Sequence, residues 1–285
     1  MKLSINWQKI LLFILAYLFI VGLFQYVGSL ICGIDLNDHS TNQGTPLQVF
    51  ILTTFGLLGT LITVWIFIKY ADKTRLIDIG FQKSVYHAPL WGFFTGLAVM
   101  CTGFLMLLLL HQIAVHPQFR FNFTDVLLTI GTCIGIAITE EVLMRGYVLN
   151  KLMNHFTKWT ALVISAVLFS LMHLFNPNIG FLPIVNLFLA GILLGLPYIF
   201  TKNLWFSIAL HFSWNFFQGL LGFNVSGLNF YSVVIQNKSS NNVWNGGLFG
   251  FEGSVLCLLL QIIAILIIYH VFSIRKDKPL CNLSS

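Results

Sequence analysis

Acidic residues are scarce in this sequence. Only nine of its 285 residues are Asp or Glu, and charged residues of both signs make up only 8% of the chain. A soluble domain carries about 25% charged residues, so this composition excludes an ordinary soluble protein. The hydrophobic share of 57% and the mean hydropathy of +0.86 agree with that. The composition predicts an all-α polytopic membrane protein.

Several motifs of common enzyme classes are also absent. The sequence contains no HExxH, Walker A, GxSxG or GxGxxG pattern, so the usual metalloprotease, nucleotide-binding and serine-hydrolase readings lack support. A net charge of +6 without a long basic run does not indicate a nucleic-acid partner. The cysteines form no CxxC pair, which predicts packed residues and no disulfide framework or thiolate zinc site. They are Cys32, Cys101, Cys133, Cys257 and Cys281.

Long apolar runs dominate what is present. A membrane-spanning helix needs about 20 mostly apolar residues, and about eight segments meet this length. They are residues 10–32, 47–70, 89–112, 124–150, 158–176, 181–200, 203–221 and 253–273. We therefore expect one transmembrane domain over residues 1–285, with about eight helices surrounded by the lipid bilayer.

The basic residues test this topology. With the N-terminus inside, only Arg120 and Lys238 fall in outer loops, and Arg145 falls within a segment. The positive-inside rule then predicts that both termini are cytoplasmic, and we expect a multi-pass protein of a bacterial plasma membrane. The residues on the inner side are Lys2, Lys9, Lys69, Lys73, Arg75, Lys83, Lys151, Lys158, Lys202, Arg275, Lys276 and Lys278.

Three charged residues interrupt the fourth apolar segment. Glu141 and Arg145 are four residues apart, so they share a helix face and can form an ion pair. Glu140 points about 100° away from Glu141 and is less well neutralised by that pair. Ionisable groups at membrane depth are rare and usually mark function. Glu140 is therefore a candidate general base, while the Glu141–Arg145 pair could be structural or could support the chemistry.

Two later segments carry histidines. Phe169 and His173 are four residues apart in the fifth segment, and His211 and Asn215 have the same spacing in the seventh. Each pair alone could reflect ordinary packing or hydrogen bonding between helices. Together with Glu140 they form a plausible hydrolytic set, with a base, an imidazole to share the proton, and donors for an oxyanion.

Depth along the helices argues against a common site. At about 1.5 Å per residue, the predicted segments place His173 nearer the outer face and His211 nearer the inner face. Tilted helices or different helix boundaries would be needed to bring the two side chains together.

These motifs resemble a known family. Glu140-Glu141-x-x-x-Arg145, Phe169-x-x-x-His173 and His211-x-x-x-Asn215, in this order, resemble the signature of the CAAX protease and bacteriocin-processing (CPBP, or Abi) intramembrane endopeptidases, which include type II CAAX prenyl endopeptidases. The resemblance covers a core of about residues 124–221. It implies a helical protease with a polar intramembrane cavity open toward the cytoplasm.

The resemblance also implies roles and a substrate class. Glu140 and His173 would activate water, and His211 and Asn215 would form the oxyanion site. Glu141 and Arg145 would support and orient the first pair. The substrate would be a membrane-associated peptide or protein, and the partners could belong to a bacteriocin system.

Alternatives stay open at this stage. We expect no cofactor, but Glu140, His173 and His211 could make a zinc site with two histidines and one glutamate. A bacteriocin self-immunity protein could act by binding, with the polar cluster only structural. A small transporter using Glu140 as a proton site is a third possibility, although the chain shows no internal repeat.

Overall fold

The computed structural model describes residues 7–34, 44–83, 87–117, 119–238 and 240–276. Eight helices of 15 residues or more run through these residues, each within one of the predicted apolar segments or overlapping it closely. They are α1 (Trp7–Ile31), α2 (Pro46–Ile66), α3 (Ala88–Leu109), α4 (Phe123–Glu141), α6 (Lys158–Met172), α7 (Phe181–Thr201), α8 (Trp205–Leu220) and α9 (Val255–Lys276). The prediction of an all-α polytopic membrane protein is confirmed.

Short elements extend this bundle. A π-helix, Phe67–Asp72, continues α2, and another, Val142–Leu149, continues α4 into the short α5 (Asn150–Leu152). The only strands in the described residues are β1 (Ala114–Val115) and β2 (Gln236–Asn237), which pair antiparallel. The described residues also include two 3-10 turns, Leu76–Ile79 and Phe251–Gly253.

Six of the helices are long and apolar enough to cross a membrane. The other two, α6 and α8, have 15 and 16 residues. At about 1.5 Å per residue they rise about 22–24 Å, which is short of a hydrocarbon core of about 30 Å. The chain is thus a multi-pass membrane protein, but the expected count of eight spans is not confirmed.

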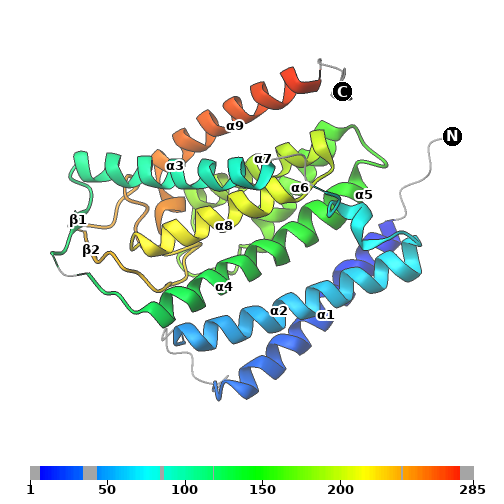
Figure 1. The fold of residues 1–285 in the computed structure, drawn as a ribbon, viewed down its shortest axis with the longest axis horizontal. Helices are drawn as coiled ribbons and strands as arrows, with labels where there is room; N and C mark the ends of the chain where they lie inside the picture. The colour runs from blue at the N-terminus through cyan, green and yellow to red at the C-terminus, as the bar shows by residue number, and fades with distance from the viewer. Residues whose placement is uncertain (1–6, 35–43, 84–86, 118, 239, 277–285) are drawn as a thin grey trace, which may run out of the picture.

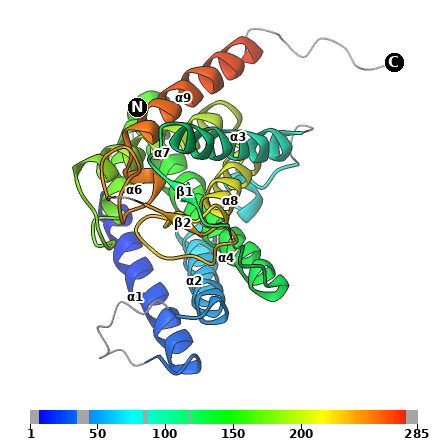
Figure 2. The same ribbon diagram turned by 90° about the vertical axis from the view of Figure 1, so that its left-hand side faces the viewer.

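The short helix α8 lies at the centre of the bundle. It packs against α3 on one side and α4 on the other, while α2 joins α4 to α1, and α7 packs against both α6 and α9 (Figure 1). The start of α1 and the end of α9 lie at one end of the bundle, opposite β1 and β2. Figure 2 shows α1 and α9 on opposite sides of the molecule. Of the two short helices, α8 is central, whereas α6 lies at the edge of the bundle, with Val163, Val167 and Leu171 exposed.

The exterior is apolar. Large side chains such as Leu18, Phe19 and Leu266 are more than half exposed on the outer helices α1 and α9, as expected of surfaces that face lipid. Four of the cysteines are free thiols; Cys133 and Cys257 are buried, and Cys32 and Cys101 are partly buried. The fifth, Cys281, lies outside the described residues.

Glycine allows α6 and α7 to approach closely. A Cβ built on Gly191 would lie 2.7 Å from the backbone Cα of Ala166, and one on Gly195 would lie 2.5 Å from Leu162. Small residues four positions apart, here Gly191 and Gly195, let two helix backbones come this close. The close approach brings the Gly191 carbonyl within reach of α4.

Replacing Gly191 with Ala should therefore destabilise the protein. The new Cβ meets backbone rather than a flexible side chain, so α6 and α7 must separate, at a cost of about 1–3 kcal/mol. Thermal unfolding in detergent measures the effect. The matched control is Gly22→Ala in α1, where a Cβ meets nothing within 4 Å. Equal unfolding temperatures for the two variants would contradict the packing argument.

Candidate functional site

A buried ion pair lies at the end of α4. Arg145 Nη1 donates to Glu141 Oε1 at 2.7 Å, and the side chains are 1% and 0% exposed. Arg145 Nη2 also donates to the Gly191 carbonyl at 3.1 Å, and the guanidinium lies 4.6 Å from the centre of the Phe169 ring. The pair predicted from the i, i+4 spacing is present and ties α4 to α6 and α7.

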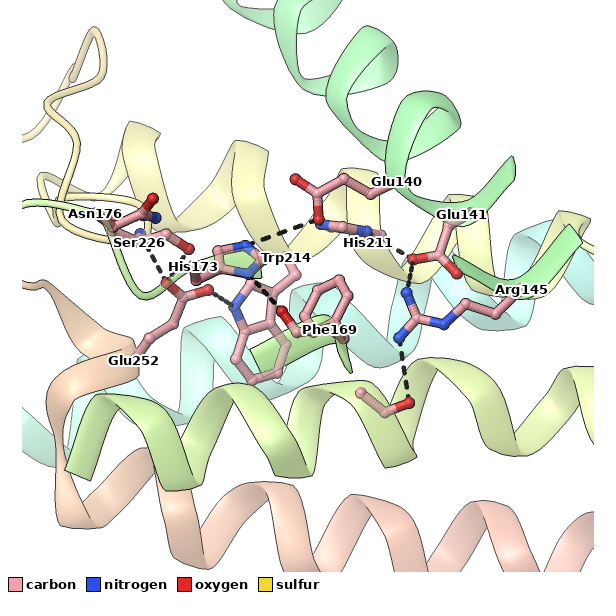
Figure 3. A network of polar contacts seen from close by, with 11 residues as sticks. Glu140, Glu141, Arg145, Phe169, His173, Asn176, His211, Trp214, Ser226 and Glu252 are labelled. Atoms are coloured by element: carbon pink, nitrogen blue, oxygen red, sulfur yellow. Dashed lines mark hydrogen bonds and ion pairs between the residues drawn. The ribbon is translucent and has the colours of Figure 1, made fainter. Parts of the chain in front are cut away.

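His211 joins this pair from α8. Its Nδ1 lies 2.8 Å from the same oxygen, Glu141 Oε1, as Figure 3 shows. Because the carboxylate already accepts from Arg145, it is an acceptor here, and Nδ1 of His211 is the donor. Glu141 therefore fixes both the position of the imidazole and its orientation.

Glu140 turns the other way, toward both histidines. Its Oε2 lies 3.9 Å from Nε2 of His173 and 3.8 Å from Nε2 of His211. This oxygen is buried and has no hydrogen-bond partner among the described residues. Both separations exceed a direct hydrogen bond and suit a bridging water.

His173 is held by the end of its own helix. Its Nδ1 lies 2.8 Å from the Phe169 carbonyl, which can only accept, so Nδ1 carries a proton and a neutral ring presents a lone pair at Nε2. The two histidines thus both offer Nε2 toward Glu140. They differ in the group behind them, a neutral carbonyl for His173 and a carboxylate for His211.

The two histidines meet Glu140 despite the difference in depth that the apolar segments predicted. The predicted segment ran to residue 176, but α6 stops at Met172, and His173 caps it. His173 thus follows the last turn of α6, whereas His211 lies in the first half of α8. Nε2 of each ring still lies within 3.9 Å of Glu140 Oε2. The placement of these helices relative to one another, which their sequences do not give, brings the two side chains together.

Asn215 lies one turn after His211 on α8. It is 4% exposed, lines the same cavity as Glu140 and the two histidines, and makes no hydrogen bond with another described residue. Its amide is thus available to a bound group. All six predicted site residues lie in or directly behind one cavity; Glu141 and Arg145 are the two behind it.

The cavity has a volume of about 280 Å³, near the lower end of the range for ligand pockets. Its walls come from α4, α6, α7 and α8 and from the α8–α9 segment, residues 221–254, which covers the end away from Glu140. Apart from the site residues it is lined mainly by apolar side chains. Those from the helices include Ile136, Phe169, Met172, Leu187, Leu193, Leu194 and Leu210.

Glu252 was missed by the sequence reasoning. It is 7% exposed and lines the cavity from the α8–α9 segment. Its Oε1 accepts from Trp214 Nε1 at 3.2 Å, and its Oε2 accepts from Ser226 N and Oγ at 2.7 and 2.8 Å. A signal existed, since this is one of only nine acidic residues and follows an apolar stretch rich in Gly and Phe.

Asn186, by contrast, does not line the cavity. Its Nδ2 donates to the backbone carbonyls of Glu252 and Ser254 at 2.7 and 2.9 Å. It therefore anchors the α8–α9 segment to α7.

The suggested zinc ligands do not form a metal site as arranged. Within the described ranges, no group of three or more His, Cys, Asp or Glu side chains is placed to hold a metal ion. The Nδ1 contacts of the two histidines do resemble those behind metal-binding imidazoles. Two ligand atoms of a tetrahedral zinc ion lie about 3.3 Å apart, whereas Glu140 Oε2 lies 3.8–3.9 Å from each Nε2. We therefore derive no step through a metal.

Comparison with known proteins gives one match. Residues 122–217 match the family described as "Type II CAAX prenyl endopeptidase Rce1-like". No curated protein and no solved structure matches the chain. The matched residues are an Rce1-like domain, which confirms the resemblance to the CPBP family and supports an intramembrane protease-like function. They contain all six predicted site residues.

The buried ion pair should dominate stability. Arg145→Met leaves Glu141 buried without its cation, and breaking a buried pair in this way costs about 3–5 kcal/mol. Unfolding of the purified protein in detergent checks this. Arg75→Met is the control, because Arg75 also pairs with a nearby carboxylate, Asp78 three residues away, but its side chain is 80% exposed. An equally small effect of both changes would contradict the central role of the buried pair.

Proposed function

We propose that this protein is an intramembrane endopeptidase that hydrolyses a peptide bond in a membrane-associated peptide or protein. The observation that carries the proposal is the position of Glu140 Oε2, buried, without a hydrogen-bond partner among the described residues, and facing Nε2 of both His173 and His211. A water between these atoms would be within reach of a base and of a peptide carbonyl in the cavity. The family match supports the reaction class.

Glu140 and His173 activate the water in this mechanism. Nε2 of neutral His173 accepts a hydrogen bond from the water, and Glu140 takes its proton as the oxygen attacks the carbonyl carbon. The tetrahedral intermediate then collapses. The C–N bond breaks, and Glu140 returns the proton to the leaving amine.

His211 and Asn215 stabilise the oxyanion. In its doubly protonated form His211 donates from Nδ1 to Glu141 and has a second N–H at Nε2 for the developing negative charge. The Asn215 amide supplies another donor from the next turn of α8. Fixed donors in a site that excludes bulk water stabilise such charge most strongly. Glu141 and Arg145 position His211 and do not touch the reacting atoms.

Glu140→Gln should abolish hydrolysis without unfolding the protein. The amide has the same shape but cannot take the proton, so a loss of at least about 10²-fold in kcat is expected. Cleavage of fluorogenic membrane-associated peptides by purified protein measures it. Asp125→Asn, on the same helix but away from the cavity, should retain activity.

The same experiment separates the other possibilities. If the Glu140→Gln variant retained full cleavage, the proposed base would be wrong. If the wild type cleaved no peptide and Glu140→Gln kept the cellular phenotype of the wild type, the result would favour a protein that acts by binding and would reject the enzyme. We expect peptidase activity to survive a strong zinc chelator. If the chelator abolished activity and added zinc restored it, the mechanism with Glu140 as base would be wrong and a metal-bound water would be favoured.

Asn215→Ala should lower kcat by about 10²–10³-fold with little change in KM, as for the loss of one oxyanion donor. Asn215→Asp tests whether the donor or only the shape matters. Asp has the volume of Asn but turns an acceptor toward the oxyanion, so kcat should fall by at least as much as in Asn215→Ala. Near-normal kcat in Asn215→Asp would remove Asn215 from the oxyanion site.

A further inference from the structure

The cavity has a second polar end. Asn176, Ser226 and Glu252 lie on one side of it and Glu140 on the other, with His173 and Trp214 between them (Figure 3). This end is built from the residues that follow α6 and from the α8–α9 segment. The mechanism proposed above makes no use of it.

The donors at this end are engaged within the protein. Ser226 donates from both N and Oγ to Glu252, and Trp214 donates from Nε1. Asn176 Nδ2 donates to the Ser226 carbonyl at 2.9 Å. What stays open toward the cavity is a set of acceptors. Glu252 Oε1 accepts only one hydrogen bond, and Asn176 Oδ1 accepts none from the described residues.

The charge at this end is also unbalanced. Glu252 is 7% exposed and forms no ion pair with a described residue, and no described residue that lines the cavity is Lys or Arg. Three neutral donors hold the carboxylate, but a buried carboxylate is stabilised far more by a cation. Open acceptors around an uncompensated carboxylate fit an ammonium or guanidinium group.

We propose that Glu252 and Asn176 bind a cationic side chain, Lys or Arg, of the peptide that is cleaved at Glu140. This inference rests on the proposed endopeptidase function and adds a substrate preference to it. The segment of the peptide between the two ends contacts the apolar wall of α7, including Leu187 and Leu194. The enzyme would thus select a basic residue at a fixed distance from the scissile bond within an apolar sequence.

A ratio of rates tests this proposal. The probes are fluorogenic peptides of one length in which Lys is moved through successive positions, each paired with a peptide carrying norleucine there. In the wild type, kcat/KM should favour Lys by about tenfold or more at one position. In Glu252→Gln this ratio should fall to about one. Because both peptides meet the same variant, a general structural defect lowers both rates and leaves the ratio unchanged.

The controls isolate the charge of Glu252. Asp125→Asn removes one negative charge outside the cavity and should keep the wild-type ratio. Arg in place of Lys at the favoured position should keep most of the preference, and a neutral citrulline should lose it. A wild-type ratio near one at every position, or an unchanged ratio in Glu252→Gln, would overturn the cation site.

Binding to an inactive protein separates this proposal from the proposed function. Fluorescence anisotropy gives the Kd of the Lys and norleucine peptides for Glu140→Gln and for Glu140→Gln combined with Glu252→Gln. Tighter binding of the Lys peptide that disappears in the double variant supports the cation site, even if the wild type cleaves no peptide and the protease proposal fails. Equal Kd values for both peptides in Glu140→Gln would reject the site while leaving the protease proposal intact.

Discussion

One carboxylate oxygen, Glu141 Oε1, holds the site together. It accepts from Arg145 at 2.7 Å and from His211 at 2.8 Å, and so joins α4 to α8. Through Arg145 the same contact reaches the Gly191 carbonyl on α7 and the Phe169 ring on α6. Four helices therefore meet around one buried charge pair. A buried carboxylate with two directional donors fixes geometry better than apolar packing, which tolerates sliding.

This arrangement explains why adjacent glutamates can have different tasks. Glu141 is fully buried and its Oε1 accepts from two donors, whereas the Glu140 side chain is 22% exposed and faces the cavity. The helix changes to a π-helix at Val142, directly after the two residues. Such π segments occur often at functional sites. The rigid pair behind the site leaves Glu140 free to take and return a proton.

The sequence was sufficient to choose the polar residues that gather around the cavity, but not to predict how they come together. Glu141 and Arg145 could be paired because i, i+4 geometry is local. The convergence of His173 and His211 on Glu140 depends on how α4, α6 and α8 are offset along the bundle, which an apolar run does not reveal. Such a run also does not reveal where α6 ends. Phe175, two residues past the last predicted polar group, is as apolar as the helix before it. The sequence did not predict Glu252 as a residue of the cavity, because its contacts with Trp214 and Ser226 join residues more than 20 positions apart. No spacing rule covers such pairs.

The shortness of α6 and α8 links these features. α6 begins at Lys158 and has only 15 residues. Residues 173–180, which follow it, have no regular helix. Non-helical backbone within a membrane protein is tolerated where it is buried or lines a polar cavity. Here it meets the α8–α9 segment through Asn176 and Ser226. The non-helical segment that begins at His173 thus contributes both a histidine that faces Glu140 and part of a second polar end, rich in acceptors, to the same cavity.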